Sequence, residues 1–430
     1  MAAAEPSIWR NGAFVRVWSA SSISYFGSFV TRTALPLAAI LVLGAGPLEV
    51  SALRSLELVA WLIVGLVAGV WVDRLRRRPI MIWADLGRAV VLGSIPVAAV
   101  AGVLGLPQLL VVAFLAAIMT PFFDSASTAY LPTIIDRQRL LAANSALSAS
   151  NSVAEFTGFS VSGFLIQLFS APIAIAIDAI SFLISGLLLA TIRRPEPPHP
   201  AVADREPILR EIRTGLRVVL GSPILRALAA AHSANHLLWG IFSTTYFLYA
   251  IRELGLGPAA IGLIAGLGGA GSFAGAAVAS RVARRLGIGR SLVVGMAGFI
   301  LANALIPLAP AGAVVVAVTL LVVQQLFGDA AGTIYGVVET SLTQSIVDAR
   351  VLGRVNASVE TFTTITALAG ALLGGVLAEA FGLRATLAVG VLLGGLSVAF
   401  LWFSPVRSLR TTPPQLATHV MTPEEGPLTE

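Results

Sequence analysis

A series of long apolar stretches constrains this chain more than any other feature. Each is around 20 residues or longer, enough for a helix to cross a hydrocarbon core of ~30 Å. Only 12% of the 430 residues are charged, about half the share usual in soluble domains, so lipid must cover the surface. The alternation typical of an outer-membrane barrel is absent. We therefore predict an all-α integral membrane protein with twelve transmembrane helices, at 14–43, 50–72, 79–104, 107–130, 142–169, 171–192, 226–251, 257–281, 290–309, 312–337, 354–379 and 383–404.

The arginines predict how the chain is oriented. They crowd the loops on one side, with four at 74–78 and seven between Arg193 and Arg226. The loops on the other side carry only Arg252 and Arg384. Cytoplasmic loops hold the excess of positive charge. We therefore predict a multi-pass protein of the bacterial cytoplasmic (inner) membrane with both termini in the cytoplasm.

An internal repeat divides the chain into two halves. Residues 134–136 and 346–348 read Ile-Ile-Asp and Ile-Val-Asp, each followed by a leucine and an asparagine at the same spacing. Two parallel repeats with a substrate site between them are a transporter architecture. We predict a six-helix half at 1–192, a cytoplasmic linker with an amphipathic helix at 193–224, a second six-helix half at 225–410 and a disordered tail at 411–430.

The residue types exclude several kinds of chemistry. The chain has no cysteine, and every basic residue other than histidine is arginine. A Walker A loop requires lysine, so the chain cannot hydrolyse ATP through that loop. It also lacks a His-Glu-x-x-His motif and a nucleophile elbow. The net charge of +6 follows from membrane topology and does not indicate a nucleic-acid partner. We predict no enzyme activity, no cofactor and no metal.

The loop after the second span resembles a known signature. Residues 69–78 read GVWVDRLRRR, similar to the G-x-x-x-D-R-x-G-R-R loop of the major facilitator superfamily. The chain looks like the branch of bacterial drug and secondary-metabolite exporters that includes macrolide-efflux and enterobactin-exporter relatives. Further segments carry this likeness at 84–89, 130–132, 143–147, 177–182, 352–358 and 382–386. The resemblance implies the major facilitator fold, with two pseudo-symmetric six-helix halves.

The resemblance also implies a gate on the cytoplasmic side. A carboxylate at the end of the second span can dock on the positive N-terminal end of a helix, and such contacts break when the gate opens. Asp85 and Arg88 share a helical face and are interpreted as an ion pair that supports the gate. Positive-inside anchoring is the alternative for Arg76, Arg77 and Arg78. The gating residues are Gly69, Asp73, Arg74, Arg77, Arg78, Asp85 and Arg88.

Three positions depart from the family pattern. Arg76 replaces the glycine of the signature loop. The pair Gly27-Ser28 stands where the branch often has an acid after a glycine, and the segment from Gly158 to Gly163 lacks the proline of many antiporters. These departures weigh against simple drug/proton antiport.

Charges inside the membrane are costly and mark functional sites. Arg32, Glu57, Asp124 and Glu155 fall within predicted spans 1, 2, 4 and 5, which line the cavity in this superfamily. We interpret Glu155 and then Asp124 as proton-linked or cation-binding groups. Glu57 fits a pair with Arg54 better. Arg32 could pair with Glu155 or bind an anionic substrate. Asp178, in span 6, matches a branch motif and is interpreted as structural.

Four polar or aromatic residues share one face of the seventh span. His232, Asn235, His236 and Trp239 are spaced at i, i+3, i+4 and i+7. With no third ligand in view, a metal site is not favoured, and we interpret the face as a polar, aromatic patch on the cavity wall. Ordinary helix packing is the alternative.

These observations favour a secondary transporter that exports amphipathic small molecules by alternating access, as a monomer and in exchange for protons. A dedicated exporter of a siderophore or another metabolite is the alternative, since Arg32 and Arg54 would suit anionic groups. A non-transporting membrane receptor is a third hypothesis.

Overall fold

The chain is helical almost throughout the part that the computed structural model describes, residues 7–193, 196 and 208–413. For residues 66–70, 73, 74, 137 and 208–211 the structure describes the backbone alone. The first six long helices are α1 (Gly12–Val42), α2 (Pro47–Arg74), α3 (Arg77–Val100), α4 (Leu106–Ile134), α5 (Leu140–Leu168) and α6 (Ala171–Ala190). After α7 (Ile208–Gly221) come α8 (Pro223–Leu248), α9 (Pro258–Leu286), α10 (Ile288–Asn303), α11 (Leu305–Leu308), α12 (Val314–Ile346), α13 (Ala349–Phe381) and α14 (Leu383–Trp402).

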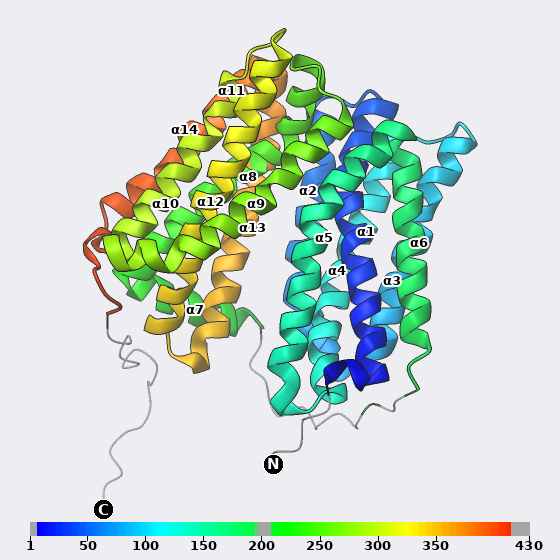
Figure 1. The fold of residues 1–430 in the computed structure, drawn as a ribbon, viewed down its shortest axis with the longest axis horizontal. Coiled ribbons are helices and arrows are strands. Elements are labelled where there is room, and N and C mark those ends of the chain that lie inside the picture. The colour runs from blue at the N-terminus through cyan, green and yellow to red at the C-terminus, as the bar shows by residue number, and fades with distance from the viewer. Residues whose placement is uncertain (1–6, 194–195, 197–207, 414–430) are drawn as a thin grey trace, which may run out of the picture.

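The helices form two bundles (Figure 1). In the first, α1 packs on α5 and α6, while α4 packs on α2 and α3. In the second, α8 packs on α13 and α14, while α12 packs on α9 and α10. The predicted all-α fold of two six-helix halves is confirmed. In Figure 1 the end of the first bundle where α1 begins and the end of the second bundle that carries α7 point the same way, and we call this end the terminus side.

Most of the predicted spans recur as helices that could cross a membrane. Among the described residues, nine spans are long and apolar enough to do so unaided, counting α10 and α11 as one span at Ile288–Leu308. Helix α8 meets the same criteria together with the preceding segment 212–221, and α2 and α5 complete the predicted twelve. α5 contains Asn144, Asn151, Glu155 and several serines, and polar residues within a span are expected to face an aqueous pathway rather than lipid.

Local sequence explains where several helices begin and end. Proline occupies the first turn of α2, α8 and α9, where its fixed φ suits a helix start and its missing N–H is not needed. Gly382 ends α13 at φ 83°, a left-handed conformation that only glycine adopts without cost. The segment 212–221 of the predicted amphipathic helix meets α8 at 111°, because Ser222 breaks the helix and caps α8. α7 packs against α13.

The two halves touch mainly through α5 with α9 and α2 with α13. A Cβ atom on Gly163 of α5 would lie 2.4 Å from the Pro258 carbonyl oxygen of α9, so the two backbones meet because glycine leaves room. Ser51 Oγ of α2 donates to the Ala371 carbonyl of α13 at 2.7 Å. Arg252, after α8, donates to the Ala45 carbonyl at 2.7 Å.

The hydrogen bonds between the halves are distributed unevenly. Among the described residues they join Ser51 to Ala371, Arg54 to Ser243, Ser160 to Gly262, and Arg252 to Gly44 and Ala45. All lie between the middle of the bundles and the end away from the terminus side. Within the described part of the chain, the halves are therefore held together by hydrogen bonds at one end and not at the other.

Candidate functional site

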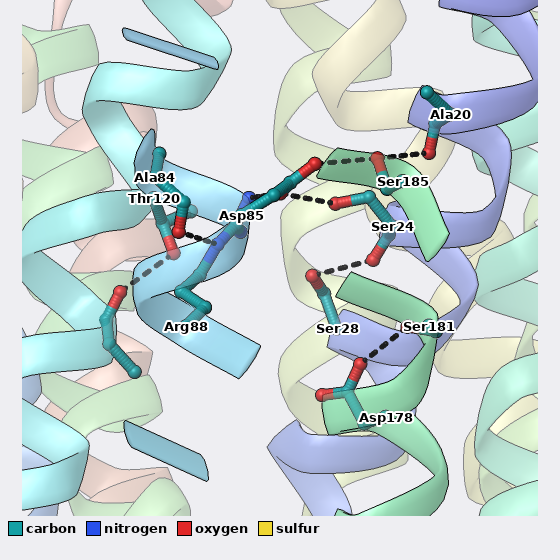
Figure 2. Close-up of polar contacts among 11 residues, drawn as sticks. Ala20, Ser24, Ser28, Ala84, Asp85, Arg88, Thr120, Asp178, Ser181 and Ser185 are labelled. Carbon is teal, nitrogen blue, oxygen red and sulfur yellow. Dashed lines mark hydrogen bonds and ion pairs between the residues drawn. The ribbon is translucent and has the colours of Figure 1, made fainter. Parts of the chain in front are cut away.

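A buried ion pair lies inside the first half, between α1, α3, α4 and α6 (Figure 2). Arg88 Nη2 donates to Asp85 Oδ1 at 2.5 Å, and both residues are on α3. Asp85 is completely buried and Arg88 is 3% exposed. The i, i+3 spacing predicted that the two side chains would meet, and the structure brings them together. Their role in a gate remains a prediction.

Neighbouring helices supply the other partners of this pair. Ser185 of α6 donates to Asp85 Oδ2 at 2.5 Å, and Ser24 of α1 donates to Asp85 Oδ1 at 3.5 Å. The Arg88 guanidinium lies over the rings of Phe182 and Phe123, at 4.1 and 4.9 Å from their centroids. Cation–π contacts of this kind are strongest where water is absent. The pair therefore ties α3 to three other helices of the first half.

A second buried carboxylate joins α6 to α1. Asp178 is fully buried and accepts hydrogen bonds from Thr31 of α1 and Ser181 of its own helix. A Cβ atom on Gly27 would fall 1.9 Å from Asp178 Oδ1, so α1 approaches α6 this closely only because residue 27 is glycine. This arrangement fits the structural role expected for Asp178.

The arginines at the start of α3 contact the first half and the segment that follows it. Glu196 accepts hydrogen bonds from the backbone N–H groups of Arg77 and Arg78 at 2.8 and 2.7 Å. The Arg78 side chain donates to the Leu189 and Ala190 carbonyls at the end of α6. Each contact neutralises the partial charge of a helix end. The predicted gating residues Gly69, Asp73 and Arg74 are described by their backbone alone.

Three of the predicted charges are exposed in the middle of their helices. Asp124, Glu155 and Arg32 all have exposed side chains, on α4, α5 and α1. Asp124 is within electrostatic range of Arg32 and Arg88, and Arg32 lies over Phe29 at 5.1 Å from the ring centroid. Among the described residues no ion pair within 4.0 Å involves any of the three, so the structure does not form the Arg32–Glu155 pair that we considered.

Glu57 is part of a pair at the end away from the terminus side. Arg54 Nη1 donates to Glu57 Oε2 at 2.8 Å, and both side chains are partly exposed. Arg54 Nε also donates to the Ser243 carbonyl of α8, at 3.4 Å. Glu57 therefore helps to hold an arginine that bridges the two halves, in agreement with the pair expected for it.

The polar face of the seventh span, now α8, opens into a cavity of the second half. His232, Asn235 and Trp239 line a space of ≈ 260 Å³ between α8, α9, α10 and α12. The His232 and His236 rings lie 5.4 Å apart, and Trp239 stacks with Phe299 of α10 at 6.4 Å. The described residues contain no cluster of three or more groups that could hold a metal ion.

A second cavity lies beside the first, toward the terminus side. Its volume is ≈ 290 Å³, and His232 lines both spaces. His236 and two carboxylates, Glu339 and Glu360, also line it, together with Val219 of α7. Glu339 accepts a hydrogen bond from Thr343 at 3.0 Å. The predicted patch on α8 is therefore the shared wall of two cavities.

Sequence reasoning left some of these residues out of the candidate site. Asp329 of α12 lines the first cavity and accepts a hydrogen bond from Gln325 at 2.6 Å. As a charge in the middle of a span it carries the same signal as Asp124. Tyr335 also lines the cavity, but an aromatic residue in an apolar helix gives no such signal. Thr31 and Ser185 belong to the site only because they donate hydrogen bonds to carboxylates on other helices, and the sequence alone does not show such contacts.

Comparison with known proteins agrees with this architecture. The chain is 27% identical over 397 residues to the uncharacterised MFS-type transporter YfiS of Bacillus subtilis (strain 168), covering 90% of this chain and 93% of that one. It is 24% identical over 209 residues to macrolide efflux protein A of Streptococcus pyogenes, covering 48% of this chain and 51% of the relative.

Solved structures share the fold at low sequence identity. The nucleoside transporter NupG superposes with a TM-score of 0.70 at 14% identity, covering 91% of this chain and 97% of that one. A bacterial homologue of the iron transporter ferroportin, in an inward-facing state, superposes with a TM-score of 0.72 at 18% identity, covering 92% and 99%. Residues 17–351 match the sequence profile of the Major Facilitator Superfamily. Because this match spans well over half of the sequence, the chain belongs to the Major Facilitator Superfamily.

Proposed function

We propose that this protein is a secondary active exporter of amphipathic small molecules, working by alternating access and coupled to proton entry. The observation that carries the proposal is a pair of carboxylates, Asp124 and Glu155, exposed midway along membrane-spanning helices with no ion-pair partner among the described residues. Charges at such depth are costly and are retained for function. The likeness to a macrolide efflux protein supports export as the direction.

The uneven contact between the halves supports alternating access. Among the described residues, the hydrogen bonds between the halves do not extend to the terminus side. The arginine distribution favours a cytoplasmic position for this side, and in this proposal the arrangement is a state open to the cytoplasm. Transport then requires these bonds to break while new ones form on the terminus side. In this proposal Gly69, Asp73 and Arg74 close that side, and the Asp85–Arg88 pair, Arg77 and Arg78 keep the first half rigid.

Proton coupling requires a carboxylate that a proton and a substrate occupy in turn. Glu155 is our first candidate and Asp124 the second, because both are accessible and neither is neutralised by a partner within 4.0 Å in the described structure. A cationic substrate would displace the proton from the carboxylate, and a returning proton would release the substrate. This competition links the two flows without any covalent step.

The proposal also keeps the predicted organisation. The halves are 1–192 and 225–410, 193–224 is a cytoplasmic linker, 411–430 is a tail, and one chain is the working unit. The membrane is the bacterial inner membrane.

The alternative, a dedicated exporter of an anionic metabolite such as a siderophore, has one observation in its favour. Arg32 is exposed midway along α1 and has no carboxylate within 4.0 Å among the described residues. Arg54 supports this alternative less, because Glu57 already neutralises it.

Everted membrane vesicles test the proposal. Vesicles from cells that express the protein are energised, and a panel of cationic, neutral and anionic compounds is added while a pH-gradient dye reports proton release. We expect a cationic amphiphile to release protons in the wild type, and Glu155→Gln or Asp124→Asn to abolish the release. Arg32→Gln should spare cationic cargo and impair anionic cargo if the alternative holds.

Direct uptake of radiolabelled compounds separates the outcomes. Uptake without proton release would disprove proton coupling and leave a uniporter or another coupling ion. Proton release that survives in both acid variants would disprove the assignment of the coupling residue. No uptake of any compound would argue against a broad drug exporter and in favour of a narrow metabolite exporter.

A further inference from the structure

The cavity between α8, α9, α10 and α12 combines an aromatic wall with a single charge. Trp239 and Phe299 stack against each other, and the His232 and Tyr335 rings meet edge to face at 6.1 Å. Met296 completes the apolar part of the lining, and Asp329 is the one acidic residue among the described residues that form the cavity. No basic residue other than His232 contributes to this lining.

The carboxylate in this cavity has no cation beside it. Asp329 accepts a hydrogen bond from Gln325, and no ion pair within 4.0 Å involves it among the described residues. Glu155 of α5 lies within electrostatic range and adds a second negative charge from across the interface. A half-buried carboxylate in a negative surrounding is costly unless a cation joins it.

Two polar atoms of the lining residues are themselves buried. The Tyr335 hydroxyl, in a residue that is 5% exposed, makes no hydrogen bond among the described residues, and neither does Asn235 Oδ1. Similar atoms occur in the first half, for example Trp18 Nε1 and Ser21 Oγ, so these two do not by themselves mark a ligand site. The charge of Asp329 and the aromatic wall are the features that distinguish the cavity.

We propose that this cavity binds a small organic cation with an aromatic or cyclic body. Asp329 is the counter-charge, and Trp239 and Phe299 form the apolar wall. The volume of ≈ 260 Å³ is just below the ~300–1,000 Å³ of drug-sized sites. The site therefore takes a ligand of one or two rings and excludes a macrocycle.

The second cavity gives this ligand a route. It shares His232 with the first and carries Glu339 and Glu360 toward the terminus side. Carboxylates at the mouth of a path raise the local concentration of cations. Binding itself does not depend on transport, and the inference rests on the proposed function only in taking the bound cation as cargo.

Ligand displacement on the full-length protein in lipid nanodiscs tests the proposal. The probe is radiolabelled benzyltrimethylammonium, a permanent cation with one ring. We expect saturable binding that unlabelled probe displaces and that benzyl alcohol and benzenesulfonate do not. Asp329→Asn, which keeps the shape of the side chain, should weaken binding at least tenfold. Glu379→Gln, which removes an exposed charge on α13, should leave binding unchanged.

A filled cavity gives an independent readout. Gly336 lines the cavity, and a Cβ atom there meets nothing within 4 Å, so Gly336→Leu should fold and abolish binding. Gly395 of α14 is equally open and does not line the cavity, so Gly395→Leu should bind like the wild type.

Several results would overturn the proposal. They are no saturable binding by the wild type, equal displacement by benzyl alcohol, unchanged affinity in Asp329→Asn, or unchanged affinity in a folded Gly336→Leu. Should Gly336→Leu fail to fold, the isosteric Asp329→Asn decides alone. The vesicle assay distinguishes this failure from failure of the proposed function. Transport without probe binding would disprove the cavity site and leave the exporter function standing. Probe binding without transport would disprove the exporter function and leave the cavity site standing.

Discussion

One buried carboxylate of the first half and one half-buried carboxylate of the second half have different surroundings. In the first half, Asp85 has Arg88, Ser185 and Ser24 as partners, and the arginine is enclosed by two aromatic rings. In the second half, Asp329 has only Gln325 among the described residues and lines a cavity. The first carboxylate is fully paired within the protein, whereas the second is open to a ligand.

This difference suggests a division of labour. A network whose members are all paired holds its helices in one arrangement, since breaking any contact exposes a desolvated group. A carboxylate without a paired cation is stabilised only when a ligand or an ion binds beside it. The first half would then move as a rigid unit, and the second half would respond to ligand. The following predictions test this comparison, beginning with the largest effect.

Breaking the buried pair of the first half should destabilise the protein most. Arg88→Met keeps an apolar side chain of similar length and leaves Asp85 buried without its cation. Loss of one partner of a buried pair costs about 3–5 kcal/mol. We expect a marked fall in the unfolding temperature of the purified protein in detergent, followed by tryptophan fluorescence.

The double variant Asp85→Asn with Arg88→Met is the control, because it removes both charges. It should recover most of the lost stability. A single Arg88→Met variant as stable as the wild type would show that the pair contributes nothing, and the comparison between the halves would fail.

Two glycines should respond to the same substitution with opposite sign. In Gly27→Ala the new methyl group would overlap the Asp178 carboxylate, since the Cβ position lies 1.9 Å from Oδ1. Forcing α1 away from α6 should cost about 1–3 kcal/mol. In Gly395→Ala the methyl group meets nothing within 4 Å, and the better helix propensity of alanine should stabilise α14 by up to about 1 kcal/mol. Unfolding temperatures measured side by side check both signs, and a tolerant Gly27→Ala would contradict tight packing in the first half.

Much of this fold was predictable because the membrane imposes one length scale. A run of apolar residues that crosses ~30 Å has to be helical, and the predicted spans recur as helices. Their ends were harder to place. α12 continues to Ile346, beyond the predicted 337, and α13 begins at Ala349 rather than 354. These extra turns contain polar residues such as Glu339 and Gln344, which carry no hydropathy signal although the helix continues through them.

The candidate site was predictable only where its contacts are local. Asp85 with Arg88 and Arg54 with Glu57 meet because each pair is three residues apart on one helix. Contacts between helices, such as Thr31 with Asp178, depend on how the helices are rotated against each other, and hydropathy does not record this. The considered pair of Arg32 with Glu155 failed to form for that reason. The cavity around Asp329 was likewise invisible, because a cavity is defined by the space that several helices leave.

The unpaired acid of the second half should be nearly neutral for stability. Asp329→Asn removes a half-buried charge that has no cation within 4.0 Å in the described structure. Residues kept for function often reduce stability, so the free energy of unfolding should be unchanged or rise by up to about 1 kcal/mol, with a matching change in the unfolding temperature. The same asparagine at position 85 should destabilise, because Arg88 would lose its carboxylate. Equal losses at positions 329 and 85, measured by thermal unfolding without ligand, would show that Asp329 is structural too.

The smallest expected effect concerns the repeated turn that precedes α5 and α13. Asp348 caps α13 by accepting from the Arg350 N–H at 2.9 Å, and the Arg350 side chain pairs with it at 2.9 Å. These hydrogen bonds lower the pKa of Asp348 from 3.8 to about 2. Because the folded-state pKa is depressed, the cap is fully present above about pH 4 and is lost as pH falls toward 2. Amide hydrogen exchange in the first turn of α13, corrected for intrinsic rates, should therefore quicken over that range.

The matching position of the first half provides the control for this effect. Asp136 reaches Arg139 only at 4.0 Å and is 80% exposed. Asp348→Asn should therefore remove the change in exchange between pH 4 and 2 at the start of α13, whereas Asp136→Asn should leave exchange in α5 as it was. If both turns lose protection in parallel as the pH falls, the acid is loosening the whole bundle, and the halves do not differ at this turn. If only the Asp348 turn responds, the repeat has kept its aspartate in both halves but uses it as a helix cap in the second alone.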